Sequence, residues 1–248
     1  FIFFCDRASF SVVNILANLT MFPSYFGIED LDGSYWTLII ELLFYTWILL
    51  VYVSNQLKNI VSLGVAFTLF ILGFHHFGNY YPDLYRFALQ KFQLINHFPL
   101  FLSGIVFFKF YAKQFSWSYL LVLIFCIASA IYLSDKGGRT MQILAPKEHA
   151  ILIIIYHLIF VLFLAEKLTF LKVQPLVFLG RISYSVYLLH QYIGLQLIRI
   201  FKTYFELDTP LSILLTIPII IGMAIVVTTY IETPAVLFIR NRYRQRQV

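Results

Sequence analysis

Charged residues are scarce in this chain. Asp, Glu, Lys and Arg make up 12% of its 248 residues, hydrophobic residues make up 60%, and the mean hydropathy is +0.83. Soluble domains are usually about 25% charged, so the composition excludes an ordinary soluble protein and predicts an integral membrane protein. The formal net charge of +6 comes from basic residues scattered among loops and gathered at the C-terminus, so it does not predict nucleic-acid binding.

Cysteine is scarce too, and the motifs of many enzyme classes are missing. Cys5 and Cys126 lie in or next to apolar segments, and we predict that both are free thiols. The chain has no G-x-S-x-G, no P-loop and no dinucleotide fingerprint. It also has no spacing of His, Cys, Asp or Glu that suits a metal, so we predict neither a metal nor a bound cofactor.

Long apolar runs dominate the rest of the chain. A membrane-spanning helix needs roughly 20 apolar residues, and strands cannot span lipid in isolation. The sequence therefore predicts an all-α, polytopic transmembrane bundle of seven to eight helices, forming a single domain over residues 1–248. The seven firm candidates are 35–54, 59–77, 95–112, 117–134, 148–166, 177–201 and 210–231, with 8–23 as a shorter eighth. Because the chain begins with Phe inside an apolar run, we expect further helices to precede it.

The distribution of charge predicts an orientation. Four arginines, Arg240, Arg242, Arg244 and Arg246, lie in the last nine residues, whereas the loop 27–33 holds three acids and no base. Because basic residues favour the cytoplasmic side, we expect the C-terminus in the cytoplasm and the acidic loop outside.

One predicted span carries a glutamate. In 33–50, Ser34, Thr37, Glu41 and Tyr45 follow at steps of three, four and four, which places them on one face of a helix. A carboxylate inside a membrane is costly, and the default interpretation is a functional one, with this face lining a cavity. The alternative is a structural carboxylate that hydrogen-bonds a neighbouring helix.

A second polar face lies in residues 179–194. Ser183, Tyr187 and His190 share it and Gly194 continues it, while Tyr184 and Gln191 lie beside it. This hydroxyl-lined face distinguishes His190 from His157, which stands among apolar residues and is predicted to be a satisfied core residue. Arg181 lies at the expected cytoplasmic end, where it either binds an anionic substrate or serves as an interfacial anchor.

A third polar element is the segment 228–235. Glu232 follows Thr228 by four residues, and Pro234 predicts a kink or a helix end there. Glu232 either takes part in a substrate site or pairs with an arginine of the tail.

These three elements together resemble the family-three membrane acyltransferases. The segment with Trp36, Thr37, Leu38, Glu41, Phe44 and Tyr45 resembles the family's W-S-L-x-x-E-x-x-F-Y pattern. The segment with Gly180, Ser183, Tyr184, Tyr187, Leu188 and His190 is similar to its G-x-x-S-Y-x-x-Y-L-x-H helix. Glu232 and Pro234 match a terminal E-x-P element.

The resemblance implies an integral membrane enzyme of about ten helices. Such enzymes move acetyl or other short acyl groups from acyl-CoA, generally acetyl-CoA, to hydroxyls of sugars or lipids, and here we expect a bacterial inner membrane. The family's leading catalytic histidine, in its first helix, has no counterpart in this chain.

We accordingly assign expected roles to ten residues. Glu41 and His190 are the predicted catalytic residues. The predicted substrate-binding residues are Ser34, Trp36, Thr37, Tyr45, Arg181, Tyr184, Tyr187 and Glu232. The expected partners are the lipid bilayer, acyl-CoA and a sugar or glycolipid acceptor. The alternatives are a transporter or flippase for a lipid-linked sugar, which the lack of an internal repeat disfavours, and a non-catalytic scaffold.

Overall fold

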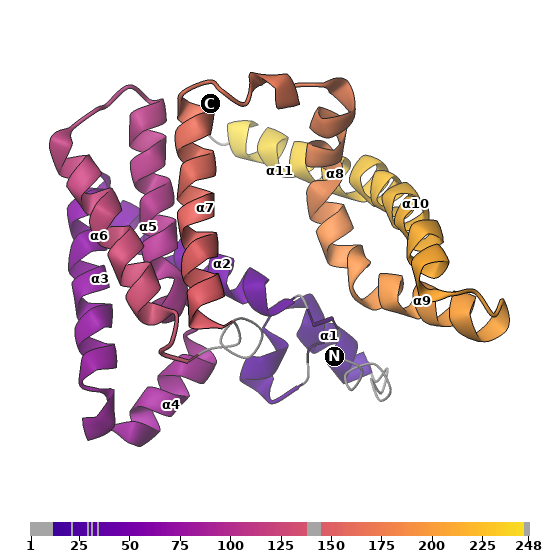
Figure 1. The fold of residues 1–248 in the computed structure, drawn as a ribbon, viewed down its shortest axis with the longest axis horizontal. Helices are drawn as coiled ribbons and strands as arrows, with labels where there is room; N and C mark the ends of the chain where they lie inside the picture. Colours follow the sequence, from indigo (N-terminus) through magenta and orange to yellow (C-terminus); the bar gives the residue numbers. More distant parts are fainter. Residues whose placement is uncertain are drawn as a thin grey trace. The chain divides into compact units, whose positions relative to one another are not determined.

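The computed structural model describes residues 12–20, 22–28, 30, 32–33, 35–137 and 145–245. Over these residues the chain forms eleven α-helices joined by short turns, with no strand (Figure 1). The all-α prediction is confirmed. The expectation that Cys5 is a free thiol lies outside the described residues, whereas Cys126 is a free, buried thiol as predicted.

The chain divides into two compact units, which we describe separately. The terminal unit comprises Phe1–Trp36 and Leu171–Val248, and the central unit comprises Thr37–Phe170. A single domain over residues 1–248 stays a prediction.

The central unit is built around one helix that packs against several others. Its helices are α2 (Tyr35–Val53), most of which lies in this unit, α3 (Ile60–His76), α4 (Pro82–Lys91), α5 (Leu94–Tyr111), α6 (Trp117–Leu133) and α7 (Pro146–Leu164). Helix α5 packs against α3, α6 and α7 (Figure 1). It therefore supplies the most buried side chains, with Phe98, Leu102 and Val106 fully inaccessible.

Within this core, His157 is held on both sides of its ring. Its Nδ1 lies 2.7 Å from the Ile153 carbonyl oxygen, and its Nε2 lies 2.9 Å from the Ser103 hydroxyl. His157, Ser103 and Ile153 are all buried. The prediction that His157 is a satisfied core residue is confirmed.

The terminal unit contains the remaining helices. These are α1 (Val12–Leu19), α8 (Gln174–His190), α9 (Tyr192–Tyr204), α10 (Thr209–Val227) and α11 (Thr233–Gln245), with a π-helical turn, η6, at Thr228–Glu232. Pro234 has no N–H to donate to the preceding turn. The α-helix accordingly gives way to the π turn before Pro234, as the predicted kink requires.

The predicted number of spans needs correction. Within the described residues, five helical segments are long and apolar enough to cross a membrane: Tyr35–Val53, Leu57–His76, Leu94–Tyr111, Pro146–Leu164 and Thr209–Gln245. Helix α6 is shorter. These helices fit an integral membrane protein. The predicted span 177–201 is broken at Gln191 into α8 and α9. In the described part of 8–23 the eight-residue helix α1 precedes a 3₁₀ turn, and residues 8–11 and 21 lie outside the described residues.

The close approach of α3 and α5 gives a stability prediction. A Cβ at Gly64 would lie 2.5 Å from Cδ1 of Leu102, a fully buried side chain, whereas a Cβ at Gly73 on the same helix meets nothing within 4 Å. Gly64→Ala should therefore lower the free energy of unfolding by about 1 kcal/mol or more through overpacking. Gly73→Ala should raise it by up to about 1 kcal/mol, because alanine favours helix.

Denaturant unfolding of both variants in detergent would measure these changes. Equal effects of the two substitutions would contradict the α3–α5 packing.

Candidate functional site

A pocket between α8, α9 and α10 is lined by the second polar face. Ser183, Tyr187 and His190 on α8 all border it, as does Gly194 on α9. Its volume is about 550 Å³, within the usual range of small-molecule sites. The predicted alignment of these four residues therefore holds, even though the predicted single helix is broken between His190 and Gly194.

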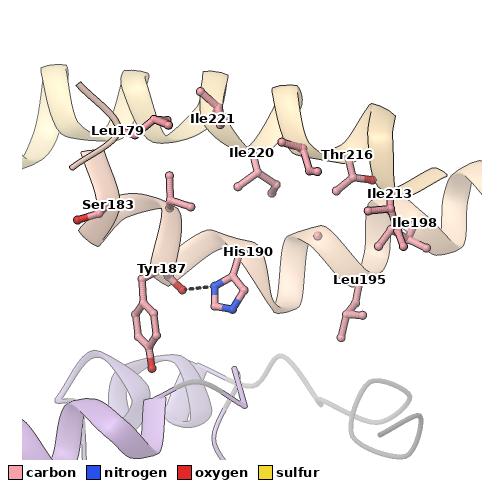
Figure 2. Close-up of a pocket in the computed structure, with 13 residues that line it drawn as sticks. Leu179, Ser183, Tyr187, His190, Leu195, Ile198, Ile213, Thr216, Ile220 and Ile221 are labelled. Atoms are coloured by element: carbon pink, nitrogen blue, oxygen red, sulfur yellow. Dashed lines mark hydrogen bonds between the residues drawn. The ribbon is translucent and has the colours of Figure 1, made fainter. Parts of the chain in front are cut away.

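The remaining wall of the pocket is aliphatic. It consists of Leu179, Val186, Leu195, Ile198, Ile213, Thr216, Ile217, Ile220 and Ile221. The Thr216 hydroxyl donates to the Ser212 carbonyl 2.8 Å away, so the hydroxyl is satisfied within its own helix. Figure 2 shows Ile220 pointing from α10 toward α8 and α9, whereas the Tyr187 ring points away from α10. The polar groups thus lie at one edge of an apolar pocket.

His190 is the last residue of α8, and the end of the helix fixes its tautomer. Its Nδ1 lies 2.7 Å from the Tyr187 carbonyl oxygen (Figure 2), one of the carbonyls that a helix end leaves without an intrahelical partner. A carbonyl only accepts hydrogen bonds, so Nδ1 carries a proton, and of the two neutral tautomers this contact selects the one with the lone pair on Nε2. His190 is exposed, and its Nε2 is placed to act as a base.

The break beside His190 is held by a buried aspartate. Asp32 is only 3% exposed, and its Oδ2 accepts a hydrogen bond from the backbone N–H of Tyr192, 3.0 Å away. Tyr192 is the first residue of α9, where helical N–H groups have no partner within the helix. The carboxylate therefore satisfies the start of α9 and ties it to a segment 160 residues earlier.

Further contacts join the same two segments. A Cβ at Gly33 would collide with Nε2 at the end of the Gln191 side chain, so these two residues lie close together. The Tyr35 backbone N–H donates to the Asp32 carbonyl, 3.2 Å away. Two motifs far apart in sequence, at 32–36 and 183–192, thus meet at the α8–α9 junction. Sequence analysis missed Asp32 by assigning it to an exposed acidic loop. The available signal was its place directly before the first motif.

Glu232 anchors α8 from the other side. Its Oε2 accepts from the Ser185 hydroxyl at 3.0 Å, and the Thr228 hydroxyl lies 3.2 Å from the same oxygen and 2.8 Å from the Ser185 hydroxyl. Ser185 and Thr228 are buried. Within the described residues, hydroxyls rather than a tail arginine hold this carboxylate, and Glu232 does not line the pocket. Sequence analysis also missed Ser185, which lies off the polar face.

Three other expected site residues occupy different positions. Arg181 and Tyr184 are exposed on α8 and do not border the pocket. Trp36 is half-buried at the start of α2. Ser34 lies outside the described residues.

In the central unit, the first polar face is more open than predicted. Glu41 and Tyr45 are exposed and Thr37 is half-buried, whereas α2 buries Leu38, Ile39 and Ile40. Within the central unit α2 thus packs through its aliphatic residues, and the expectation that Glu41 and Tyr45 line a cavity stays a prediction. Among the described residues no group of His, Cys, Asp or Glu is arranged to hold a metal.

Comparison with known proteins gives one match. The family model described as "Acyltransferase domain", of acyltransferase family 3, matches residues 1–232. No curated protein and no solved structure matches the chain.

The Asp32–Tyr192 bond predicts a stability difference between two capping aspartates. Asp208 caps α10 within its own turn, where it accepts from Leu211 N–H at 3.1 Å. Asp208→Ala should cost about 1 kcal/mol, as an ordinary N-cap does. Asp32→Ala should cost roughly 2 kcal/mol or more, because it leaves a partly buried N–H unpaired and releases a tertiary contact.

Asp32→Asn should recover most of the loss, since the amide oxygen still accepts. Thermal unfolding of the three variants in detergent would show which substitution lowers stability most. If Asp32→Ala were no more harmful than Asp208→Ala, the junction would not depend on this carboxylate.

Proposed function

The chain belongs to the acyltransferase 3 family, and from this premise we propose that it moves an acyl group from acyl-CoA to a hydroxyl of a sugar or glycolipid. Membership makes the protein a membrane acyltransferase. The donor, the acceptor and the formation of an O-ester are the proposal. One observation carries it: a histidine at the edge of a pocket, with Nδ1 fixed to a backbone carbonyl and Nε2 bonded to none of the described residues.

The proposed reaction uses His190 as a general base. Nε2 takes the proton of the acceptor hydroxyl while the hydroxyl oxygen bonds to the thioester carbonyl carbon. The carbon–sulfur bond of the tetrahedral intermediate then breaks, and the imidazolium gives its proton to the departing CoA thiolate. The products are an ester and free CoA. The Tyr187 hydroxyl, on the same face, is the proposed donor to the developing oxyanion.

The remaining predicted residues are proposed to bind the substrates. Exposed Arg181 suits a CoA phosphate, which guanidinium groups bind well. We propose that Trp36, Thr37, Tyr184 and Ser34 contact substrate from the two motifs. Glu232, by contrast, supports the site through Ser185.

We propose a bacterial inner membrane as the location, with the C-terminal arginines in the cytoplasm. This orientation would place Arg181 on the side where CoA thioesters are made. O-acetylation of a surface polysaccharide or lipopolysaccharide fits this arrangement.

His190→Gln should lower acyl transfer by roughly 100-fold or more, because it removes the base. His76→Gln is the matched control, since His76 is exposed and does not border the pocket. Initial rates with radiolabelled acetyl-CoA in membranes would measure both. A His190→Gln variant that folds and transfers at the wild-type rate would rule out this base.

Glu41 is proposed separately to orient the acceptor hydroxyl. Because it is exposed and the structure records no bond for it among the described residues, Glu41→Gln should leave thermal stability unchanged. Transfer to the acceptor should fall by at least about tenfold, or roughly 1.4 kcal/mol of transition-state stabilisation.

Thr46→Ala is the control on the same helix, because Thr46 is exposed and bonds only locally, to the Leu42 carbonyl. Unchanged transfer by Glu41→Gln would assign Glu41 no part in catalysis.

A further inference from the structure

The pocket beside His190 extends well beyond the space that an acetyl group needs. The lining continues past His190 along α9 through Gly194 and Leu195 to Ile198. From Tyr192 to Ile198 the helix rises about 9 Å. In the other direction the lining runs back along α8 to Ser183 and Leu179, next to Arg181. His190 therefore lies between two arms of one pocket.

The α9 arm is apolar and uncharged. It is formed by Gly194, Leu195 and Ile198 on α9 and faces Ile213, Thr216 and Ile217 on α10. The Thr216 hydroxyl is turned to Ser212. The methyl carbon Cγ2 of Thr216 faces Gly194 instead, and a Cβ at Gly194 would lie 3.8 Å from it. Burying methylenes against such a surface favours binding, whereas burying a charge against it opposes binding.

We propose that the α9 arm binds the hydrocarbon chain of the donor's acyl group, so that the preferred donor carries several methylenes rather than acetyl alone. This inference rests on the proposed function and specifies its substrate. The thioester carbonyl would lie at His190, the acyl chain would run toward Ile198, and the remainder of the donor would follow the α8 arm toward Arg181.

The donor's acyl chain fits better than the tail of a lipid acceptor for a geometric reason. The acyl carbonyl must lie within reach of the hydroxyl that His190 deprotonates, and its chain begins one bond away. A chain held in the α9 arm is therefore directly joined to the reacting carbon.

Substitutions at Gly194 test the α9 arm most directly. It is buried at the α9 arm, and a Cβ there makes an ordinary contact, so Gly194→Ala is tolerated and Gly194→Leu fills the arm. Gly222→Leu is the matched control on α10, because Gly222 does not border the pocket and a Cβ there meets nothing within 4 Å.

The experiment measures kcat/KM for acetyl-, butyryl- and hexanoyl-CoA with one acceptor. Each buried methylene should raise kcat/KM by about fourfold. The kcat/KM for hexanoyl-CoA should therefore exceed that for acetyl-CoA by on the order of 100-fold. Succinyl-CoA, with as many carbons as butyryl, should be poor because its carboxylate would be buried.

Gly194→Leu should lower the hexanoyl-to-acetyl ratio by at least about tenfold, Gly194→Ala by less, and Gly222→Leu should leave it unchanged. A wild-type protein that prefers acetyl, or a ratio that Gly194→Leu does not change, would overturn the acyl-chain site while leaving acyl transfer intact. Absence of transfer from every thioester would instead overturn the proposed function.

The same donors separate the two sources of a hydrocarbon chain. With acetyl-CoA as donor, kcat/KM is compared for acceptors with and without a lipid tail. If the tail raises kcat/KM and Gly194→Leu abolishes that gain, the arm holds the acceptor, and the proposal is wrong.

Discussion

The hydrogen bond from the Tyr192 amide to the Asp32 carboxylate is the interaction on which the candidate site depends. It occurs where the chain has stopped one helix and starts another, so it decides where α8 ends. At the end of α8 the His190 ring bonds the Tyr187 carbonyl, and that contact sets the tautomer of the histidine that borders the pocket. The bond thus fixes the α8–α9 junction, beside which the pocket lies.

Glu232 supports the same helix through Ser185, by different means. Its partners are hydroxyls on two elements, Ser185 on α8 and Thr228 in the π turn. A π turn places an extra residue in a helix and is often retained at functional positions. Here it brings the carboxylate and Thr228 to the same buried serine. The helix that carries Ser183, Tyr187 and His190 is thus fixed through residues that do not themselves border the pocket.

Sequence periodicity predicted the helical fold and the shared face of α8, because both depend on local spacing. Ser183, Tyr187 and His190 lie at helical intervals, and no distant residue is needed to align them. The break at Gln191 could not be predicted in this way, since Gln191 is neither proline nor glycine and the capping carboxylate lies 160 residues away in sequence. Spacing placed Glu41 on one face of α2, but it could not predict that α2 packs in the central unit through Leu38, Ile39 and Ile40, because the neighbouring helices decide which face is buried. Ser185 could not be predicted from local spacing, because its partner Glu232 lies 47 residues away in sequence.

Covalent acyl transfer from a CoA thioester is the central proposal for this protein, and its stoichiometry is the most direct measurement of it. The whole protein, purified and placed in lipid bilayers, would be given acyl-CoA and a glycolipid acceptor. Free CoA thiol would be followed with a thiol reagent, and the acceptor would be weighed by mass spectrometry. We predict that one CoA thiol is released for each acyl group that the acceptor gains. Movement of the glycolipid across the bilayer with no thiol released and no gain in mass would contradict it and would indicate a transporter.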